Sequence, residues 1–319
     1  MLKVLGLRVL RLVATLLAVS FLTFMLGVFL PGDPINAILP PDAPRDEATV
    51  ARITDELGLD DPTLVRYGRW LGDAATGDLG YSYVTDQPVW DTIKQRLPVT
   101  GQLAIMATVI ALLIAVPTGV IGGYKEGKPI DKFSSAGVQI GLSVPSFIVG
   151  IFLIWLFTVK TGFLGLPSTG WRRVSTDGLW ENLKSSILPA VALSLSPMAF
   201  YTRLLRSDMI GTLKEDFVLS ARAKGLTDRY ILGRHALRPS SLSLVTIIGI
   251  QIGILLGGTV VIEQIFALPG LGSRLLNAIN QRDILMVQGI TVFIATVYVV
   301  VNTLVDFIYM AIDPRIRKR

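Results

Sequence analysis

The chain contains no cysteine and only one histidine among its 319 residues. Without cysteine it cannot form a disulfide bond, a thiolate nucleophile or a thiolate-ligated metal site. A single histidine excludes metal sites built from several histidines, including the H-E-x-x-H motif of zinc hydrolases. Thiol chemistry and histidine-based zinc chemistry are therefore both ruled out as functions of this chain.

Charge is also scarce. Only 17% of the residues are charged and 51% are hydrophobic, whereas soluble domains carry about 25% charged residues. This composition is typical of an integral protein of the lipid bilayer. The formal net charge of +6 would suggest nucleic acid in a soluble protein, but in a membrane protein it is better explained as an orientation signal. We therefore expect no nucleic-acid partner.

The hydrophobic residues are grouped into six runs long enough to cross a membrane, which takes about 20 apolar residues as a helix. These runs predict an all-α membrane protein with six transmembrane helices at residues 12–30, 103–122, 136–159, 187–204, 242–262 and 287–312. The first run is either an uncleaved helix or a signal peptide. Its length and the lack of an A-x-A cleavage site favour an uncleaved helix.

Lysine and arginine concentrate in the N-terminal tail, in the short segments 123–135 and 203–238, and in the C-terminal tail. This distribution predicts that both termini lie in the cytoplasm. Residues 31–98 then lie outside and are too polar for lipid. Two short helices are expected there, at 48–57 and 64–71, and Gly58 is expected to end the first of them. This small cap either covers the outer helix ends or docks an external partner.

Gly249, Gly253 and Gly257 recur every four residues in the fifth run and so share one helix face. Such a face permits close helix packing, either within the chain or against a second, similar subunit. Glu263 ends the same run, where it either forms a structural ion pair or faces the substrate route. With Gln139 and Ser143, it is a candidate path-lining residue.

The segment 208–239 is polar and basic although it lies between two apolar runs. Thr212 and Glu215 form a capping-box pattern that predicts a helix through Lys224. Gly225 is placed to end that helix in a left-handed conformation. A second helix is expected to begin at Thr227 and Asp228 and to end at Pro239. Its lone histidine, His235, is interpreted as a surface hydrogen-bonding group.

One motif in the chain is misleading. Residues 122–129 nearly match the phosphate-loop pattern G-x-x-x-x-G-K-[ST], but Pro129 replaces the hydroxyl residue that binds Mg²⁺. No strand is expected before the motif, so nucleotide binding is not predicted. If the protein uses ATP and Mg²⁺, partner subunits have to hold them.

Several motifs together resemble the inner-membrane permeases of ATP-binding-cassette (ABC) importers, of the dipeptide, oligopeptide and nickel type. The EAA pattern of that family aligns with Leu219-Ser220-Ala221, Gly225 and residues 235–238, although Leu219 replaces the glutamate and the proline comes one residue late, as Pro239. Nearly the whole chain is covered, through Pro31-Gly32-Asp33-Pro34, Leu57-Gly58-Leu59, Ser143-Val144-Pro145-Ser146-Phe147, Pro269-Gly270-Leu271-Gly272 and Asp313-Pro314-Arg315-Ile316-Arg317.

This resemblance implies a type I ABC importer permease fold in a bacterial inner membrane. It implies a tail and first helix at 1–30, an extracytoplasmic segment at 31–98, a permease core at 99–312 with a cytoplasmic coupling loop at 208–239, and a tail at 313–319. The implied partners are a second permease, two ATPase subunits and an extracytoplasmic substrate-binding protein. The implied coupling residues, which would sit in a cleft on an ATPase subunit, are Asp216, Ala221, Arg222, Ala223, Lys224, Gly225 and Leu226.

Peptides are the expected substrate, and nickel chelates, glutathione, haem and oligosaccharides remain open. Two other function classes compete with an importer subunit. A membrane-embedded enzyme is disfavoured because the chain has no cysteine, one cytoplasmic histidine and no paired intramembrane carboxylates. An ion-coupled carrier acting alone would favour more intramembrane charges and an inverted repeat, and no clear repeat is visible.

Overall fold

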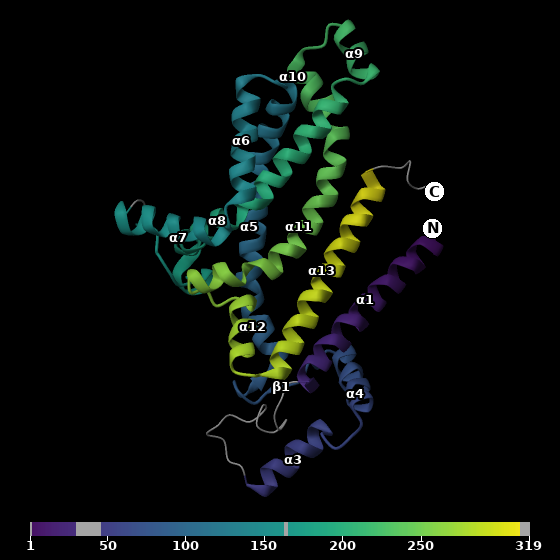
Figure 1. Ribbon diagram of the computed structural model, residues 1–319, viewed down its shortest axis with the longest axis vertical. Helices are drawn as coiled ribbons and strands as arrows, with labels where there is room; N and C mark the ends of the chain where they lie inside the picture. Colours follow the sequence, from purple (N-terminus) through teal and green to yellow (C-terminus); the bar gives the residue numbers. More distant parts are fainter. Residues whose placement is uncertain (1, 30–45, 163–164, 313–319) are drawn as a thin grey trace. The chain divides into compact units, whose positions relative to one another are not determined.

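The computed structural model describes residues 2–29, 46–162 and 165–312 (Figure 1). Within these ranges the chain is almost entirely helical, apart from one two-stranded antiparallel sheet. Two motifs of the family resemblance, residues 31–34 and 313–317, lie outside the described residues. The chain divides into two compact units, one made of Met1–Thr100 and Pro269–Val299, the other of Gly101–Leu268 and Val300–Arg319.

Unit 1 combines the first helix with the polar segment that follows it and with the chain after residue 269. Its core brings together Leu79, Val89, Ile93, Leu271, Ala278, Met286 and Ile290. Its elements are α1 (Leu2–Phe29), α3 (Glu47–Leu57), α4 (Thr63–Thr76), β1 (Tyr81–Ser82), β2 (Gln87–Pro88), the first turns of α5 (Val89–Tyr124), α12 (Leu271–Asn280) and most of α13 (Ile284–Ile312).

The two short helices expected after the first span are confirmed as α3 and α4. The Asp46 carboxylate accepts a hydrogen bond from the Thr49 N–H at the start of α3, and this bond lowers the pKa of Asp46. Gly58 ends α3 at a φ of 57°, as its position predicts. Tyr67 of α4 packs edge-on against Phe21 of α1 with 5.2 Å between ring centroids, so α4 is held against the first helix.

Unit 2 is organised around α8, which packs against α6, α7 and α11. Its core includes Ala111, Ala115, Tyr201, Leu205, Met209, Ala236 and Leu244. Its elements are the rest of α5, α6 (Pro129–Ser143), α7 (Ser146–Leu153), the π-helical segment η1 (Ile154–Lys160), α8 (Val174–Thr212), α9 (Asp216–Ala223), α10 (Asp228–Tyr230), the π-helical segment η3 (Ile231–Ala236), α11 (Leu237–Ile265) and the end of α13.

Five helices of the described chain are long and apolar enough to cross a membrane, and a bent helix pair raises the number to six. The bent pair is the third span expected at 136–159, and Pro145, which predicts a kink in that span, lies at the bend. Its two parts, Pro129–Ser143 and Ser146–Lys160, meet at 98°. Pro145 has no N–H and disfavours helical angles at the preceding residue. Val144 accordingly adopts an extended conformation, with φ −90° and ψ 120°.

One correction concerns Pro239, which was expected to end a helix. Instead, helical structure continues from Asp228 to Ile265. Pro239 is the third residue of α11 and follows the π-helical segment η3. Because the helix is continuous here, proline removes one backbone hydrogen bond, and the adjoining π-helical turns of η3 shift the bonding pattern so that the helix passes Pro239.

The helix of the fifth run is followed by a break. Helix α11 ends at Ile265, Ala267 adopts a positive φ of 49°, and α12 resumes the helix at Leu271. Gly249 lies where α11 meets α13, because a Cβ atom added there would collide with the Val305 side chain. Gly253 is also buried, whereas Gly257, on the same face, is exposed, with open space around its Cα.

We predict that Gly249→Ala destabilises the protein by about 1–3 kcal/mol, the usual effect of overpacking a close contact. The comparison is Gly257→Ala, which adds the same methyl group where it meets nothing within 4 Å. Thermal unfolding in detergent measures both. A midpoint for Gly249→Ala equal to that of Gly257→Ala would contradict the close packing of α11 on α13.

Candidate functional site

The segment between α8 and α11 forms a small folded unit of its own, which we call the loop module (residues 213–236). In Figure 1 its helices α9 and α10 lie beyond the ends of α6 and α11, at one end of unit 2. The chain leaves α8 at Thr212, turns over Leu213 and Lys214, and enters α9 at Asp216. The module therefore rests on the ends of two long helices.

The capping box expected at Thr212 is wrong. Thr212 is the last residue of α8, and its hydroxyl accepts a hydrogen bond from Ser240 Oγ at 2.9 Å. Helix α9 begins later, with Glu215 at its N-cap position and without a side-chain cap. The sequence pattern predicted that the Thr212 hydroxyl caps a new helix, but this hydroxyl instead bonds to Ser240 of α11.

The predicted role of Gly225 is confirmed. Its φ is 77°, and it lies just after the end of α9. The Gly225 N–H donates to Arg222 O at 2.9 Å, and the Leu226 N–H donates to Ala221 O at 3.3 Å. These bonds close the helix end in the Schellman arrangement, in which left-handed glycine is favoured. A tight turn then leads into α10 at Asp228, as expected.

A hydrophobic cluster fixes the angle between the two helices of the loop module. Val218 and Ala221 on α9 pack against Ile231, and these side chains are 0%, 6% and 1% exposed. Leu213 covers the cluster from the side of the incoming turn. Because α9 and the η3 segment, which continues α10, contribute to one buried core, the loop module is a packed unit rather than a flexible loop.

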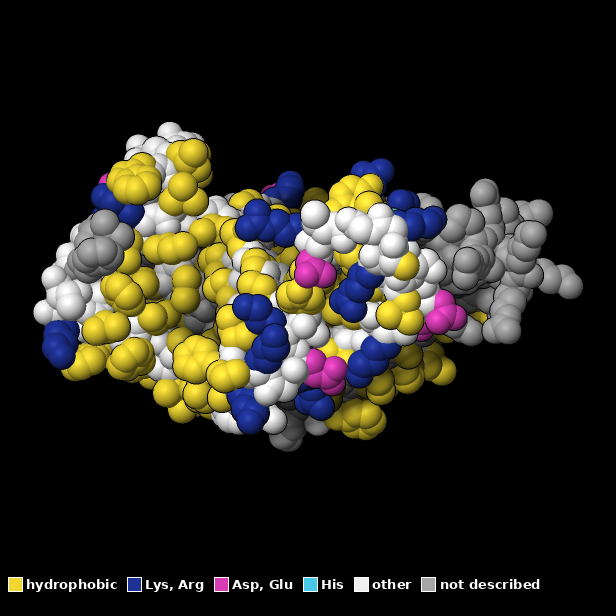
Figure 2. Space-filling model, turned by 90° about the horizontal axis from the view of Figure 1, so that it is seen from above, with side chains coloured by type: hydrophobic (Ala, Val, Ile, Leu, Met, Phe, Trp, Pro, Cys, Tyr) yellow, Lys and Arg dark blue, Asp and Glu magenta, His cyan; other side chains and the backbone are white. Residues whose placement is uncertain are grey.

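The outer surface of the loop module combines apolar groups with charged groups, and exposed basic residues outnumber the exposed acidic residues Glu215, Asp216 and Asp228. Phe217 is 46% exposed and Leu219 is 53% exposed. Figure 2 views the molecule from the end where α9 lies and shows lysine and arginine side chains gathered there, with apolar side chains among them. The exposed basic residues of the module are Lys214, Arg222, Lys224, Arg229 and Arg234. Such a surface suits a partner groove that has apolar pockets and acidic edges.

The expected site residues fall into separate groups. Residues 216–226 come together in the loop module, where Ala221 is buried and the others named for coupling are exposed: Asp216, Arg222, Ala223, Lys224, Gly225 and Leu226. Gln139 and Ser143 are exposed on α6, and Ser143 Oγ donates to the Gln139 carbonyl at 2.8 Å. Glu263 is fully buried on α11. The structure does not bring Glu263 together with Gln139 and Ser143 at a shared surface.

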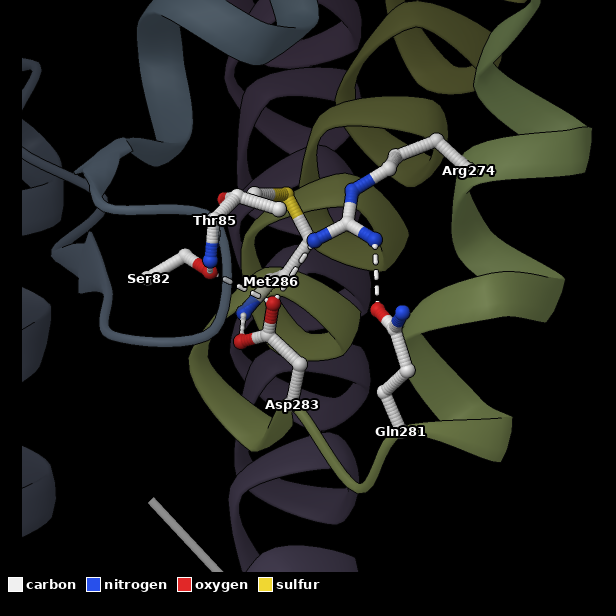
Figure 3. Close-up of polar contacts among 6 residues, drawn as sticks. All are labelled: Ser82, Thr85, Arg274, Gln281, Asp283 and Met286. Atoms are coloured by element: carbon white, nitrogen blue, oxygen red, sulfur yellow. Dashed lines mark hydrogen bonds and ion pairs between the residues drawn. The ribbon is translucent and has the colours of Figure 1, made fainter. Parts of the chain in front are cut away.

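Unit 1 contains a buried ionic cluster that sequence reasoning missed (Figure 3). Arg274 of α12 donates from Nη2 to Asp283 Oδ2 at 2.8 Å, and the two side chains are only 6% and 4% exposed. Ser82 Oγ of the hairpin donates to the same oxygen at 2.6 Å. The N–H of Met286 donates to the other oxygen at 3.2 Å, and Gln281 accepts from Arg274 Nη1 at 3.1 Å.

This cluster ties three separate parts of unit 1 together: the β1–β2 hairpin, α12 and the first turn of α13. A nearby exposed pair shows the contrast, because Tyr81 donates to Asp86 at 2.6 Å on the hairpin surface and this bond raises the pKa of Tyr81. The sequence contains one local indication of the buried pair: Arg274 and Asp283 are nine residues apart and Asp283 lies between two helices.

The fold and the loop module thus define a multi-pass helical membrane protein with a structured element between two of its spans. Comparison with known proteins specifies the family. The family model "Binding-protein-dependent transport system inner membrane component" matches residues 115–318, and the model of the corresponding N-terminal region matches residues 1–104. The chain belongs to this family and is a permease component of the inner membrane.

Curated relatives match over almost the full length. A putative peptide transport system permease protein of Brucella abortus (strain 2308) is 41% identical over 97% of each chain. The oligopeptide transport system permease protein AppB of Bacillus subtilis is 36% identical, also over 97% of each chain. A dipeptide transport system permease protein, DppB of Alkalihalophilus pseudofirmus, is 34% identical over 97% of this chain and 98% of the relative.

Among solved structures, an inward-facing MetNI methionine ABC transporter contains a chain with the same fold. The TM-score is 0.54 at 18% identity, with 69% of this chain and 96% of that chain covered. A second crystal form of that transporter gives a TM-score of 0.56 at 19% identity, with 70% and 96% covered. The importer permease fold expected from the sequence is therefore confirmed.

We predict a graded response at Gly225. Gly225→Ala costs about 1–2 kcal/mol, because an L-residue is strained at this positive φ, although its Cβ would meet nothing within 4 Å. Gly225→Asn costs less, since asparagine tolerates this conformation. Gly225→Pro disrupts the module, because proline fixes φ near −65°. Hydrogen exchange of residues 213–236 reports the order, and equal protection in all three variants would refute it.

We also predict that Asp283→Asn lowers stability by about 3–5 kcal/mol, because it leaves the buried Arg274 charge uncompensated. The matched control is Asp61→Asn. The Asp61–Arg69 pair is also 2.8 Å long, but its side chains are 40% and 51% exposed, so its loss costs only about 0–1 kcal/mol. Thermal unfolding in detergent compares the two, and similar midpoints would argue against a buried charge at Asp283.

Proposed function

We propose that this permease, with a second permease of the same family, forms the path of an ABC importer for peptides. It has six spans and both termini in the cytoplasm. Residues 1–30 form a tail and the first helix, 31–98 an extracytoplasmic segment, 99–312 the core with the coupling loop 208–239, and 313–319 a tail. The bent pair α6–α7 counts as one span in this topology.

The observation that carries the peptide assignment is the full-length similarity to curated permeases named for peptides, dipeptides and oligopeptides. The similarity extends through both halves of the chain, including the region of the loop module. Nickel chelates, glutathione, haem and oligosaccharides are the alternative cargoes, because permeases of one fold accept the cargo that a binding protein delivers. An ion-coupled carrier acting alone has no use for a rigid projecting module.

We assign four partners to the chain: the second permease, two ATPase subunits and an extracytoplasmic substrate-binding protein. ATP and Mg²⁺ belong to the ATPase subunits, so this chain is a non-catalytic transport subunit. Residues 122–129, which resemble a phosphate loop in sequence, begin inside the last turn of helix α5 and do not follow a strand. The free energy of ATP hydrolysis therefore reaches this chain only as a displacement that the ATPase subunits impose on it.

The loop module supplies what such a displacement requires. Its buried cluster of Val218, Ala221 and Ile231 makes it rigid, and exposed Phe217 and Leu219 offer side chains that fill a groove on an ATPase. Because α8 enters the module and α11 continues from it, a push on α9 is delivered to the ends of both helices. Asp216, Arg222 and Lys224 provide polar contacts at the edges of that interface.

For the transport path we retain Gln139, Ser143 and Glu263 as candidates. Exposed Gln139 and Ser143 precede the bend at Pro145, where a polar surface on a membrane helix needs water or a partner. Glu263 is buried within the chain and would reach the path only if α11 moves. Gly249, Gly253 and Gly257 are the proposed packing face of α11, with Gly257 available to a second subunit.

The decisive experiment isolates the complex and measures uptake. Affinity purification through this chain should recover a second permease, ATPase subunits with Walker motifs and the binding protein. In proteoliposomes the complex should accumulate peptides from an enzymatic casein digest only when ATP reaches the ATPase side. Uptake without ATP or any ATPase subunit would instead establish a stand-alone carrier. ATPase stimulation by the loaded binding protein without peptide uptake would retain the importer and reject the peptide cargo.

A further inference from the structure

The turn between α5 and α6 (residues 122–131, called the α5–α6 turn below) is packed tightly against α8. A Cβ atom added to Gly123 would lie 2.6 Å from Met209 Cβ and 3.1 Å from the Arg206 carbonyl oxygen. One added to Gly119 would lie 3.1 Å from Leu205 Cβ. The end of α5 therefore approaches α8 as closely as glycine allows.

An ion pair fastens the other side of this turn. Asp131, whose side chain is 4% exposed, accepts hydrogen bonds from both Nε and Nη2 of Arg206, the latter at 2.8 Å. The Gly127 N–H donates to Asp131 Oδ2 at 2.8 Å. Bidentate pairing with arginine fixes orientation as well as distance. Together with the glycine packing, it makes the α5–α6 turn one rigid body with the end of α8.

The same turn also reaches the loop module through two contacts. Tyr124 Oη donates to Asp228 Oδ2 at 2.6 Å, at the start of α10. Lys214 Nζ lies 3.2 Å from Glu126 Oε2, in the turn that precedes α9. These contacts engage the loop module at both ends. Both contacts are solvent-exposed, and the Lys214 and Glu126 side chains are 68% and 49% exposed. Water therefore screens the ion pair, and the short, charge-assisted Tyr124–Asp228 bond is the better-defined connection.

We propose that Tyr124, supported by Glu126, is a positioning residue that makes α5 and α6 follow the loop module. The backbone alone joins the module only to α8 and α11. The Tyr124–Asp228 bond adds a second connection, through a turn that the Asp131–Arg206 pair holds rigid. A displacement of α10 therefore reaches α5 and α6 directly, in addition to reaching them through α8. This inference rests on the proposed function of the loop module as the element that ATPase subunits displace.

The test measures coupling efficiency as peptides imported per ATP hydrolysed, using the reconstituted complex, the loaded binding protein and the casein digest. Tyr124→Phe removes only the hydroxyl group and should lower this ratio by roughly two- to tenfold, the range expected for one lost hydrogen bond. Asp228→Ala removes the accepting carboxylate and should lower the ratio similarly. The double variant should fall no further than the more affected single variant, because both changes remove the same interaction.

The matched control is Tyr81→Phe, which removes a hydroxyl that donates to Asp86 at the same 2.6 Å distance in unit 1. It should retain the wild-type ratio. Gel filtration of each complex confirms that all variants assemble. A wild-type ratio in Tyr124→Phe, or additive losses in the double variant, would overturn the inference while leaving the proposed function intact. If the wild-type complex itself shows no ATP-dependent uptake, the proposed function fails and the inference fails with it.

Discussion

The close packing of α8 is the constraint on which unit 2 depends. This helix meets α6, α7 and α11, and it carries alanine and serine at many of its buried positions. Its neighbours contribute glycine at the nearest points: a Cβ atom on Gly141 of α6 would lie 2.9 Å from Ala199 Cβ. Inside a bilayer no hydrophobic force drives helices together, so close van der Waals packing between small residues supplies the association energy. This packing also determines the position of the loop module, because the module begins where α8 ends.

Proline has three different consequences in this unit, and the sequence pattern alone does not separate them. Pro145 breaks the chain between α6 and α7, whereas Pro189 and Pro197 lie inside α8, and Pro239 lies in the first turn of α11. The missing N–H is the same in each case. What differs is whether neighbouring helices and local π-helical turns compensate for the lost hydrogen bond, and that depends on packing.

Much of the candidate site could be derived locally. The left-handed glycine at 225 and the start of a helix at Asp228 follow from turn and helix-end chemistry within a few residues. The capping box at Thr212 failed because Ser240, 28 residues away, bonds its hydroxyl. The connection of Tyr124 to Asp228 spans 104 residues, and that of Asp131 to Arg206 spans 75. No rule based on residue spacing along the sequence predicts pairs so far apart.

The sequence by itself determined the class of the protein: long apolar runs specify membrane helices, the lack of cysteine and the single histidine exclude whole groups of chemistry, and glycine and proline mark most of the element ends. These properties follow from hydropathy and backbone sterics, which act over one to a few helical turns. Only the tertiary structure decided which charges are buried together, as in Arg274 with Asp283, which glycines touch a neighbour, and how far the third span bends at Pro145. Those outcomes depend on which segments meet in space, and the sequence specifies that only through the packing of the whole chain.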